Sequence, residues 1–259
     1  MDMKTDYTKV TELPGQRGSE EQIERLFHRY CFARQYCDGK DVLEVACGGG
    51  IGLGYLSKKA KRIVGIDIEE GNLIFAEQLY ENRNNIETKI MDAHHFDFDN
   101  ETFDVVILYE ALYYLKDPDL FFKEAHRVLR KGGHLIIGTV NKEWDDFNPS
   151  PYSVRYFSGS EIQAALQPLF QIIHMYGAFS TIPTSAKDVI LSSIKRAAVS
   201  LHMMPKTMKG KEFLKKIFFG KLVPLPKELS EHMSAYTSPQ PVVGNNIKEY
   251  KVLYAVASK

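Results

Sequence analysis

Short apolar runs alternate with amphipathic segments along the chain, and the alternation is regular from residue 19 to residue 141. Runs typical of buried strands stand at 42–46, 62–68, 86–92, 103–110 and 134–140. Segments with apolar residues at helical spacing begin near residues 19, 51, 72 and 117. Strands that alternate with helices in this way predict parallel β-α units and a doubly wound α/β sheet.

Capping signals mark several helix ends. The stretches Ser19–Gln22 and Ser158–Glu161 both have the form of a capping box, and the first predicts an N-terminal helix over 19–38. Asp117 followed by proline predicts a helix start, and the glycine pair at 132–133 predicts its end.

Two more strands are predicted beyond the regular region, at 170–179 and 250–258, and a long insertion at 181–246 separates them. Within it, residues 187–231 hold ten basic and four acidic residues, an excess of +6. Two apolar stripes keep helical spacing there: Ile190, Ile194, Ala197, Ala198 and Leu201, then Phe213, Leu214, Ile217 and Phe218. They favour a helical lid. A basic membrane-contacting surface and a homodimer interface are the alternatives.

Composition limits the class of protein. The 259 residues are 44% hydrophobic and 25% charged, as expected for one globular domain spanning 1–259. The 33 basic and 33 acidic residues cancel, which argues against a general nucleic-acid binder. No apolar run reaches the roughly 18–20 residues of a membrane span. The polar start and three unpaired cysteines, Cys31, Cys37 and Cys47, lead us to expect a cytoplasmic protein with reduced thiols and no metal site.

A glycine-rich turn follows the first strand, in the stretch Glu44-x-Ala46-Cys47-Gly48-Gly49-Gly50. Ligands of open parallel sheets bind at the carboxyl ends of the strands, where this turn lies. A dinucleotide-binding G-x-G-x-x-G would need a third glycine where Leu53 or Tyr55 stands, and a phosphate-binding P-loop would need a lysine that the turn lacks.

The turn resembles the E/D-x-G-x-G-x-G loop of class I S-adenosylmethionine-dependent methyltransferases, with Ala46 in place of a glycine. The resemblance extends over about 30–141 and resumes at the last two strands. It implies a seven-stranded Rossmann-like sheet of order 3-2-1-4-5-7-6 with strand seven antiparallel. The implied cofactor is S-adenosylmethionine, with S-adenosylhomocysteine as product.

The same resemblance implies a set of cofactor contacts. Glu44 would orient the methionine end, Asp67 would accept from the ribose hydroxyls, and Asp92 with Ala93 would meet the adenine. The expected cofactor-binding residues are Tyr30, Glu44, Ala46, Cys47, Gly48, Gly50, Asp67, Ile68, Asp92, Ala93 and Tyr109.

The stretch YEALYYLKDP, residues 109–118, resembles the strand-four exit of quinone-biosynthesis and other small-molecule methyltransferases, with Tyr113-Tyr114 where that family often has a histidine. An oxygen acceptor usually needs a base to take its proton, and the candidates are Glu110, His94 and His95. The stretch bears no likeness to the [DN]-P-P-[FY] motif of many nucleic-acid and protein amino-group methyltransferases, so we expect no nucleic-acid partner.

The segment after the fifth strand, residues 141–158, is rich in aromatic residues. Its flat rings with Asn and Arg suit a sugar ring, and the expected substrate residues are Tyr113, Trp144, Tyr152, Arg155 and Tyr156. The preferred acceptor is therefore a hydroxyl on a small molecule such as a sugar, a glycolipid or a natural product. Methyl transfer to nitrogen or carbon of a small or lipid-linked acceptor, and a non-catalytic S-adenosylmethionine-binding protein, are the alternatives.

Overall fold

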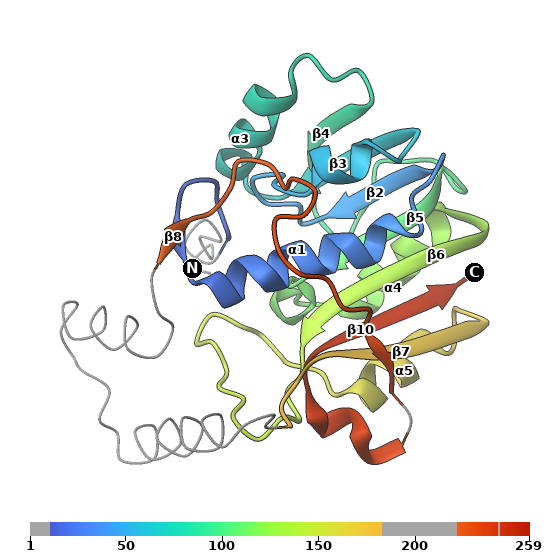
Figure 1. The fold of residues 1–259 in the computed structure, drawn as a ribbon. Coiled ribbons are helices and arrows are strands. Elements are labelled where there is room, and N and C mark those ends of the chain that lie inside the picture. Colours follow the sequence, from blue (N-terminus) through green and yellow to red (C-terminus); the bar gives the residue numbers. More distant parts are fainter. Residues whose placement is uncertain (1–10, 183–221, 243) are drawn as a thin grey trace, which may run out of the picture.

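A computed structural model describes residues 11–182, 222–242 and 244–259, which form one mixed sheet with helices on both faces (Figure 1). The sheet order is β4-β3-β2-β5-β6-β10-β7-β9. Its strands are β2 (Asp41–Val45), β3 (Arg62–Asp67), β4 (Ile86–Ile90), β5 (Phe103–Tyr109), β6 (Leu129–Val140), β7 (Ile172–Ser180), β9 (Gln240–Pro241) and β10 (Tyr250–Ser258).

The topology confirms the order expected from the sequence. Strands β4, β3, β2, β5 and β6 are parallel neighbours, while β10 runs antiparallel between β6 and β7. The short edge strand β9, which pairs with β7, is an addition that no sequence pattern indicated. The parallel strands at the centre are almost completely buried because helices cover both of their faces.

Two hydrophobic cores lie on opposite faces of the sheet. Helices α1 (Glu20–Arg34), α2 (Leu53–Ser57) and α3 (Glu70–Tyr80) contribute to one core. Helices α4 (Pro118–Val128) and α5 (Gly159–Leu166), with the short 3-10 helix η2 (Leu112–Tyr114), contribute to the other. A second 3-10 turn, η3 (Gly244–Glu249), precedes β10.

Of the two predicted capping boxes, only the one at Ser158 forms completely. Ser158 makes both bonds of a capping box with Glu161, as predicted. Ser19 caps α1 through a bond from the backbone of Gln22, but the Gln22 side chain bonds to Glu12 instead of closing the box.

The predicted end of α4 is wrong. The helix stops at Val128, and the glycine pair at 132–133 lies inside β6. Leu129 already pairs with Phe103 of β5, so sheet pairing begins three residues before the first of these glycines.

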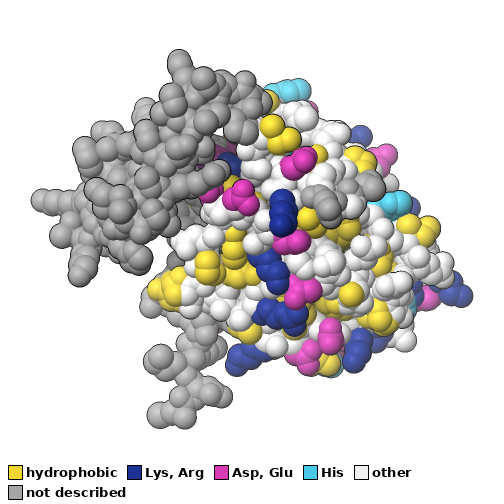
Figure 2. All heavy atoms as spheres, turned by 90° about the horizontal axis from the view of Figure 1, so that it is seen from below, with side chains coloured by type: hydrophobic (Ala, Val, Ile, Leu, Met, Phe, Trp, Pro, Cys, Tyr) yellow, Lys and Arg dark blue, Asp and Glu magenta, His cyan; other side chains and the backbone are white. Residues whose placement is uncertain are grey.

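Most of the insertion falls outside the described residues. Both apolar stripes and most of the basic excess lie in 183–221, so the lid, the membrane contact and the dimer interface stay predictions. The described part, 222–242, contains no helix; it runs extended, and its β8 (Val223–Pro224) pairs with β1 (Arg17–Gly18). Among the described helices, none is long and apolar enough to span a bilayer. On the face shown in Figure 2, basic side chains lie beside acidic ones.

Gly52 offers a test of how α1 packs on the glycine turn. Its φ of −89° suits any residue, but an added Cβ would lie 1.9 Å from Cε1 of Tyr30. We expect Gly52→Ala to lower the free energy of unfolding by about 1–3 kcal/mol, measured by denaturant titration, because the Tyr30 ring must move. In a Tyr30→Ala background the same change should cost much less; an equal cost in both backgrounds would contradict this packing.

Candidate active site

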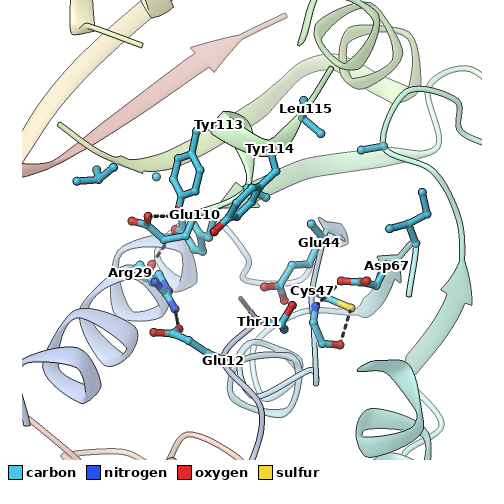
Figure 3. A pocket seen from close by; sticks show the side chains of 18 of the residues that line it. Thr11, Glu12, Arg29, Glu44, Cys47, Asp67, Glu110, Tyr113, Tyr114 and Leu115 are labelled. Atoms are coloured by element: carbon cyan, nitrogen blue, oxygen red, sulfur yellow. Dashed lines mark hydrogen bonds and ion pairs between the residues drawn. The ribbon is translucent and has the colours of Figure 1, made fainter. Parts of the chain in front are cut away.

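A single large cavity lies at the carboxyl ends of the parallel strands, between the sheet and α1 (Figure 3). Its volume is about 1040 Å³. Pockets for small molecules usually span roughly 300–1,000 Å³, so this one has room for two ligands side by side.

The cavity gathers residues that the sequence placed at four separate strand ends. All the expected cofactor-binding residues line it except Gly50. Glu110, His94 and Tyr113 line it too, whereas His95, Trp144, Tyr152, Arg155 and Tyr156 are not among the described lining residues. In Figure 3, Asp67 and Cys47 lie on one side, and Glu110 and Tyr113 lie on the other.

The turn after β2 bends sharply to expose its backbone. Ala46, Gly48 and Gly50 have φ values of 55°, 56° and 71°, the left-handed region that glycine tolerates best. Alanine at position 46 therefore accepts some strain where the resembling family has glycine. A Cβ on Gly48 would lie 2.7 Å from Thr11, so glycine is needed there for close approach as well.

Glu44 is the most deeply buried acid of the cavity, with 2% of its surface exposed. The Tyr30 hydroxyl donates to its Oε1, while its Oε2 has no partner among the described residues. Burial raises the pKa of Glu44 to about 7. A buried carboxyl oxygen without a donor is costly, and a ligand amine would satisfy it. The site therefore fits the methionine end of S-adenosylmethionine.

Asp67 is held in a fixed orientation at the end of β3. Its Oδ2 accepts from the Gly48 backbone N–H at 2.9 Å, and its Oδ1 accepts from the Glu69 N–H at 2.9 Å and from Asn72 Nδ2 at 3.2 Å. Carboxylate oxygens have further lone pairs for the ribose hydroxyls of an adenosyl ligand.

His94 has both ring nitrogens engaged. Its Nε2 accepts from the Asp117 backbone N–H at 3.2 Å, so its Nδ1 carries the proton and donates to Asp92 at 2.6 Å. No nitrogen is left to take a proton from an acceptor. With His95 outside the described lining, Glu110 is the base candidate that the geometry favours.

Glu110 follows β5 with a φ of 51°, a left-handed conformation unusual for glutamate. Its backbone N–H donates to Gly138 at 2.8 Å, and its side chain accepts from the Tyr113 hydroxyl at 2.9 Å. Burial raises the pKa of this carboxyl above its usual value. Strained backbone at a cavity wall is typical of functional residues.

Sequence reasoning assigned Tyr30 of α1 to the cavity but missed the other residues that α1 and the segment before it contribute. Arg29 of α1 forms an ion pair with Glu12 and lies between Glu12 and Glu110 in Figure 3. Glu12 belongs to the N-terminal strap, residues 11–18, which covers the glycine turn: Thr11 and Pro14 contact Gly48 and Gly49. The polar residues of α1 recur at helical spacing, but that spacing does not reveal which of them face a ligand.

The aromatic segment after β6 lies behind the cavity wall. The Tyr156 ring stacks on Tyr113 with centroids 4.8 Å apart, and the Val154 N–H donates to the Tyr113 carbonyl at 2.8 Å. Lys251 lies over the Trp144 ring, 5.4 Å from its centroid. Tyr156 and Val154 therefore support Tyr113, and the predicted contact of the segment with substrate stays a prediction.

Comparison with known proteins points to one family. A family model described as a methyltransferase domain matches residues 43–137. The phthiotriol/phenolphthiotriol dimycocerosates methyltransferase of Mycobacterium leprae is 35% identical over 147 residues, covering 54% of this chain and 53% of that protein. The ubiquinone biosynthesis O-methyltransferase of Pseudomonas syringae is 32% identical over 117 residues, covering 44% and 48%. The chain thus spans about half the length of these curated relatives.

A solved structure shares the fold. Phosphoethanolamine N-methyltransferase 2 of Haemonchus contortus, in complex with S-adenosylmethionine, superposes with a TM-score of 0.55 at 15% identity, covering 95% of this chain and 53% of that one.

The raised pKa of Glu44 predicts a pH dependence of cofactor binding. An ionised Glu44 attracts the ligand ammonium, and with a pKa of about 7 its ionised fraction rises about tenfold between pH 6 and 8. We expect the association constant of S-adenosylhomocysteine, measured by calorimetry, to rise by up to that factor. Glu44→Gln should bind more weakly and lose this dependence; an equally steep profile in the variant would refute the assignment.

Proposed function

We propose that the protein is a class I S-adenosylmethionine-dependent methyltransferase that methylates a hydroxyl of a small-molecule acceptor, namely a sugar, a glycolipid or another natural product. The match of residues 43–137 to a methyltransferase domain supports this proposal. The observation that carries the choice of a hydroxyl is Glu110. It is a half-buried carboxyl in the cavity wall whose one hydrogen-bond partner among the described side chains is Tyr113.

The cofactor half of the cavity is formed by Glu44, Asp67 and Asp92. Glu44 Oε2 would accept from the cofactor amine, Asp67 from the ribose hydroxyls, and Asp92 from the adenine amine. When bound, S-adenosylmethionine supplies a sulfonium methyl: the acceptor oxygen forms the new C–O bond as the S–C bond breaks, and that electron pair stays on sulfur in S-adenosylhomocysteine.

Glu110 would take the proton that the acceptor hydroxyl loses in this step. Its raised pKa makes the carboxylate a better base near neutral pH than an exposed glutamate. The Tyr113 hydroxyl holds the carboxyl in place, and Tyr156 stacks behind Tyr113. Alignment of acceptor and methyl within one enclosed cavity supplies much of the remaining rate enhancement.

The cavity size and one relative support this choice. A volume of about 1040 Å³ accommodates a small acceptor beside the cofactor. The Pseudomonas syringae relative is named as an O-methyltransferase.

Cofactor binding is tested by thermal unfolding with S-adenosylmethionine, S-adenosylhomocysteine and NAD. A ligand at about 100 times its dissociation constant adds roughly 2.7 kcal/mol to stability, and we expect that gain with the two adenosyl ligands alone. Asp67→Ala should reduce it, because the ribose hydroxyls lose their acceptor. Stabilisation by NAD alone would overturn the proposed function.

The role of Glu110 is tested by Glu110→Gln, which keeps its shape and removes the base. With S-adenosylmethionine carrying a labelled methyl group and an acceptor found by screening glycosides and phenols, we expect kcat to fall by about 10²–10⁴-fold. Binding of S-adenosylhomocysteine should stay unchanged. His95→Asn is the matched control and should retain activity. Full activity of Glu110→Gln, His94→Asn and His95→Asn would instead indicate a nitrogen acceptor.

A further inference from the structure

Three tyrosines of the cavity wall share a property: their hydroxyl protons are donated to other groups of the protein. The Tyr30 hydroxyl donates to Glu44, and that of Tyr113 donates to Glu110 at 2.9 Å. The Tyr109 hydroxyl donates to the Arg29 backbone carbonyl at 2.7 Å. Each of these hydroxyls therefore offers lone pairs, and no proton, to a ligand.

The Tyr254 hydroxyl of β10 also donates its proton within the protein, in this case to the buried His28. His28 Nε2 lies 2.9 Å from the Thr237 carbonyl oxygen, which can only accept, so Nε2 carries the proton. Burial lowers the pKa of His28, which keeps the ring neutral at pH 7. Its Nδ1 must then accept, and the Tyr254 hydroxyl, 2.9 Å away, is the donor.

Two arginines that line the cavity are paired with acids, whereas Lys116, which also lines it, is exposed and forms no ion pair among the described residues. Arg29 is paired with Glu12, and Arg25 is paired with Glu21 at 2.7 Å. Glu110, in contrast, has no lysine or arginine within ion-pair distance among the described residues. The acceptor half of the cavity therefore presents an unpaired carboxyl and hydroxyl lone pairs.

We propose that one wall of the cavity accepts hydrogen bonds and so selects a neutral, polyhydroxylated acceptor over an anionic one. The wall consists of Tyr109, Glu110, Tyr113 and Tyr254. His28 sets the direction in which the Tyr254 hydroxyl donates. The proposal rests on the proposed function, because it assigns this wall to the acceptor. Hydroxyl groups donate to such a wall. An anionic group against this wall would lose its water, find no donor among these four residues and lie beside the Glu110 carboxyl, which is unfavourable.

The test uses pairs of probes that differ by one group. The first pair is methyl β-D-glucopyranoside and its C6 carboxylate, methyl β-D-glucopyranosiduronate. Each is titrated into the 259-residue protein saturated with S-adenosylhomocysteine, and binding is followed by ligand-observed NMR. The corresponding galactose and mannose pairs are then measured in the same way. We expect the neutral member of at least one pair to bind at least about tenfold more tightly than its uronate. Equal or tighter uronate binding, or no neutral glycoside binding, would overturn the proposal.

Three variants test the polarity of the wall. Tyr254→Phe removes lone pairs and should weaken binding of the neutral glycoside. His28→Phe frees the Tyr254 proton to point into the cavity, so the preference for the neutral member should shrink. His28→Gln can still accept from Tyr254 and donate to Thr237, so it should restore the preference.

The outcomes separate a polarity role from a structural one. If His28 were only structural, both variants would change stability or S-adenosylhomocysteine affinity and leave the ratio of neutral to uronate affinity unchanged. That result would overturn the role assigned to His28. Tyr254→Phe remains informative if the His28 variants do not fold. Failure of the wild type to bind S-adenosylhomocysteine would remove the proposed function itself. Normal cofactor binding without discrimination between the probes would overturn this inference alone.

Discussion

The hydrogen bond from Tyr30 to Glu44 is the interaction on which the rest of the site depends. It fixes one oxygen of a carboxyl at the end of the first strand of the sheet and leaves the other oxygen without a donor. The Tyr30 ring also fills the space above Gly52, so α1 can lie against the glycine turn. A single side chain thus joins the covering helix, the turn and the buried acid. The resulting cavity favours a cationic ligand group.

The meeting of four acids at one cavity could be predicted from the sequence because parallel strands place their carboxyl ends at one edge. Glu44, Asp67, Asp92 and Glu110 each stand at the end of a strand or directly after one, and a one-dimensional pattern locates all four. The order of the strands could be predicted as well, through the resemblance of the glycine turn. The end of α4 could not, because pairing of Leu129 with β5 overrides the local signal of the glycine pair.

The acceptor half could not be predicted, because its contacts join residues far apart in the chain. His28 and Tyr254 are separated by 226 positions, and nothing in either local pattern indicates that they meet. The aromatic segment after β6 shows a related limit of local patterns. Its composition indicated substrate contact, yet Tyr156 stacks on the wall residue Tyr113. Amphipathic spacing shows which side of an element is buried, but not whether a core, a loop or a ligand covers it.

The direction of each proton in the cavity follows from groups that can only accept. The Thr237 carbonyl determines the tautomer of His28, His28 determines the direction of the Tyr254 hydroxyl, and carboxyls do the same for Tyr30 and Tyr113. Because these groups are buried, reversing one bond would leave another group without a partner, at about 1–3 kcal/mol each. The polarity of the wall is therefore as fixed as its shape. Thr237 lies in the described part of the insertion, 222–242, so the position of that segment sets the polarity of the site where we place the acceptor.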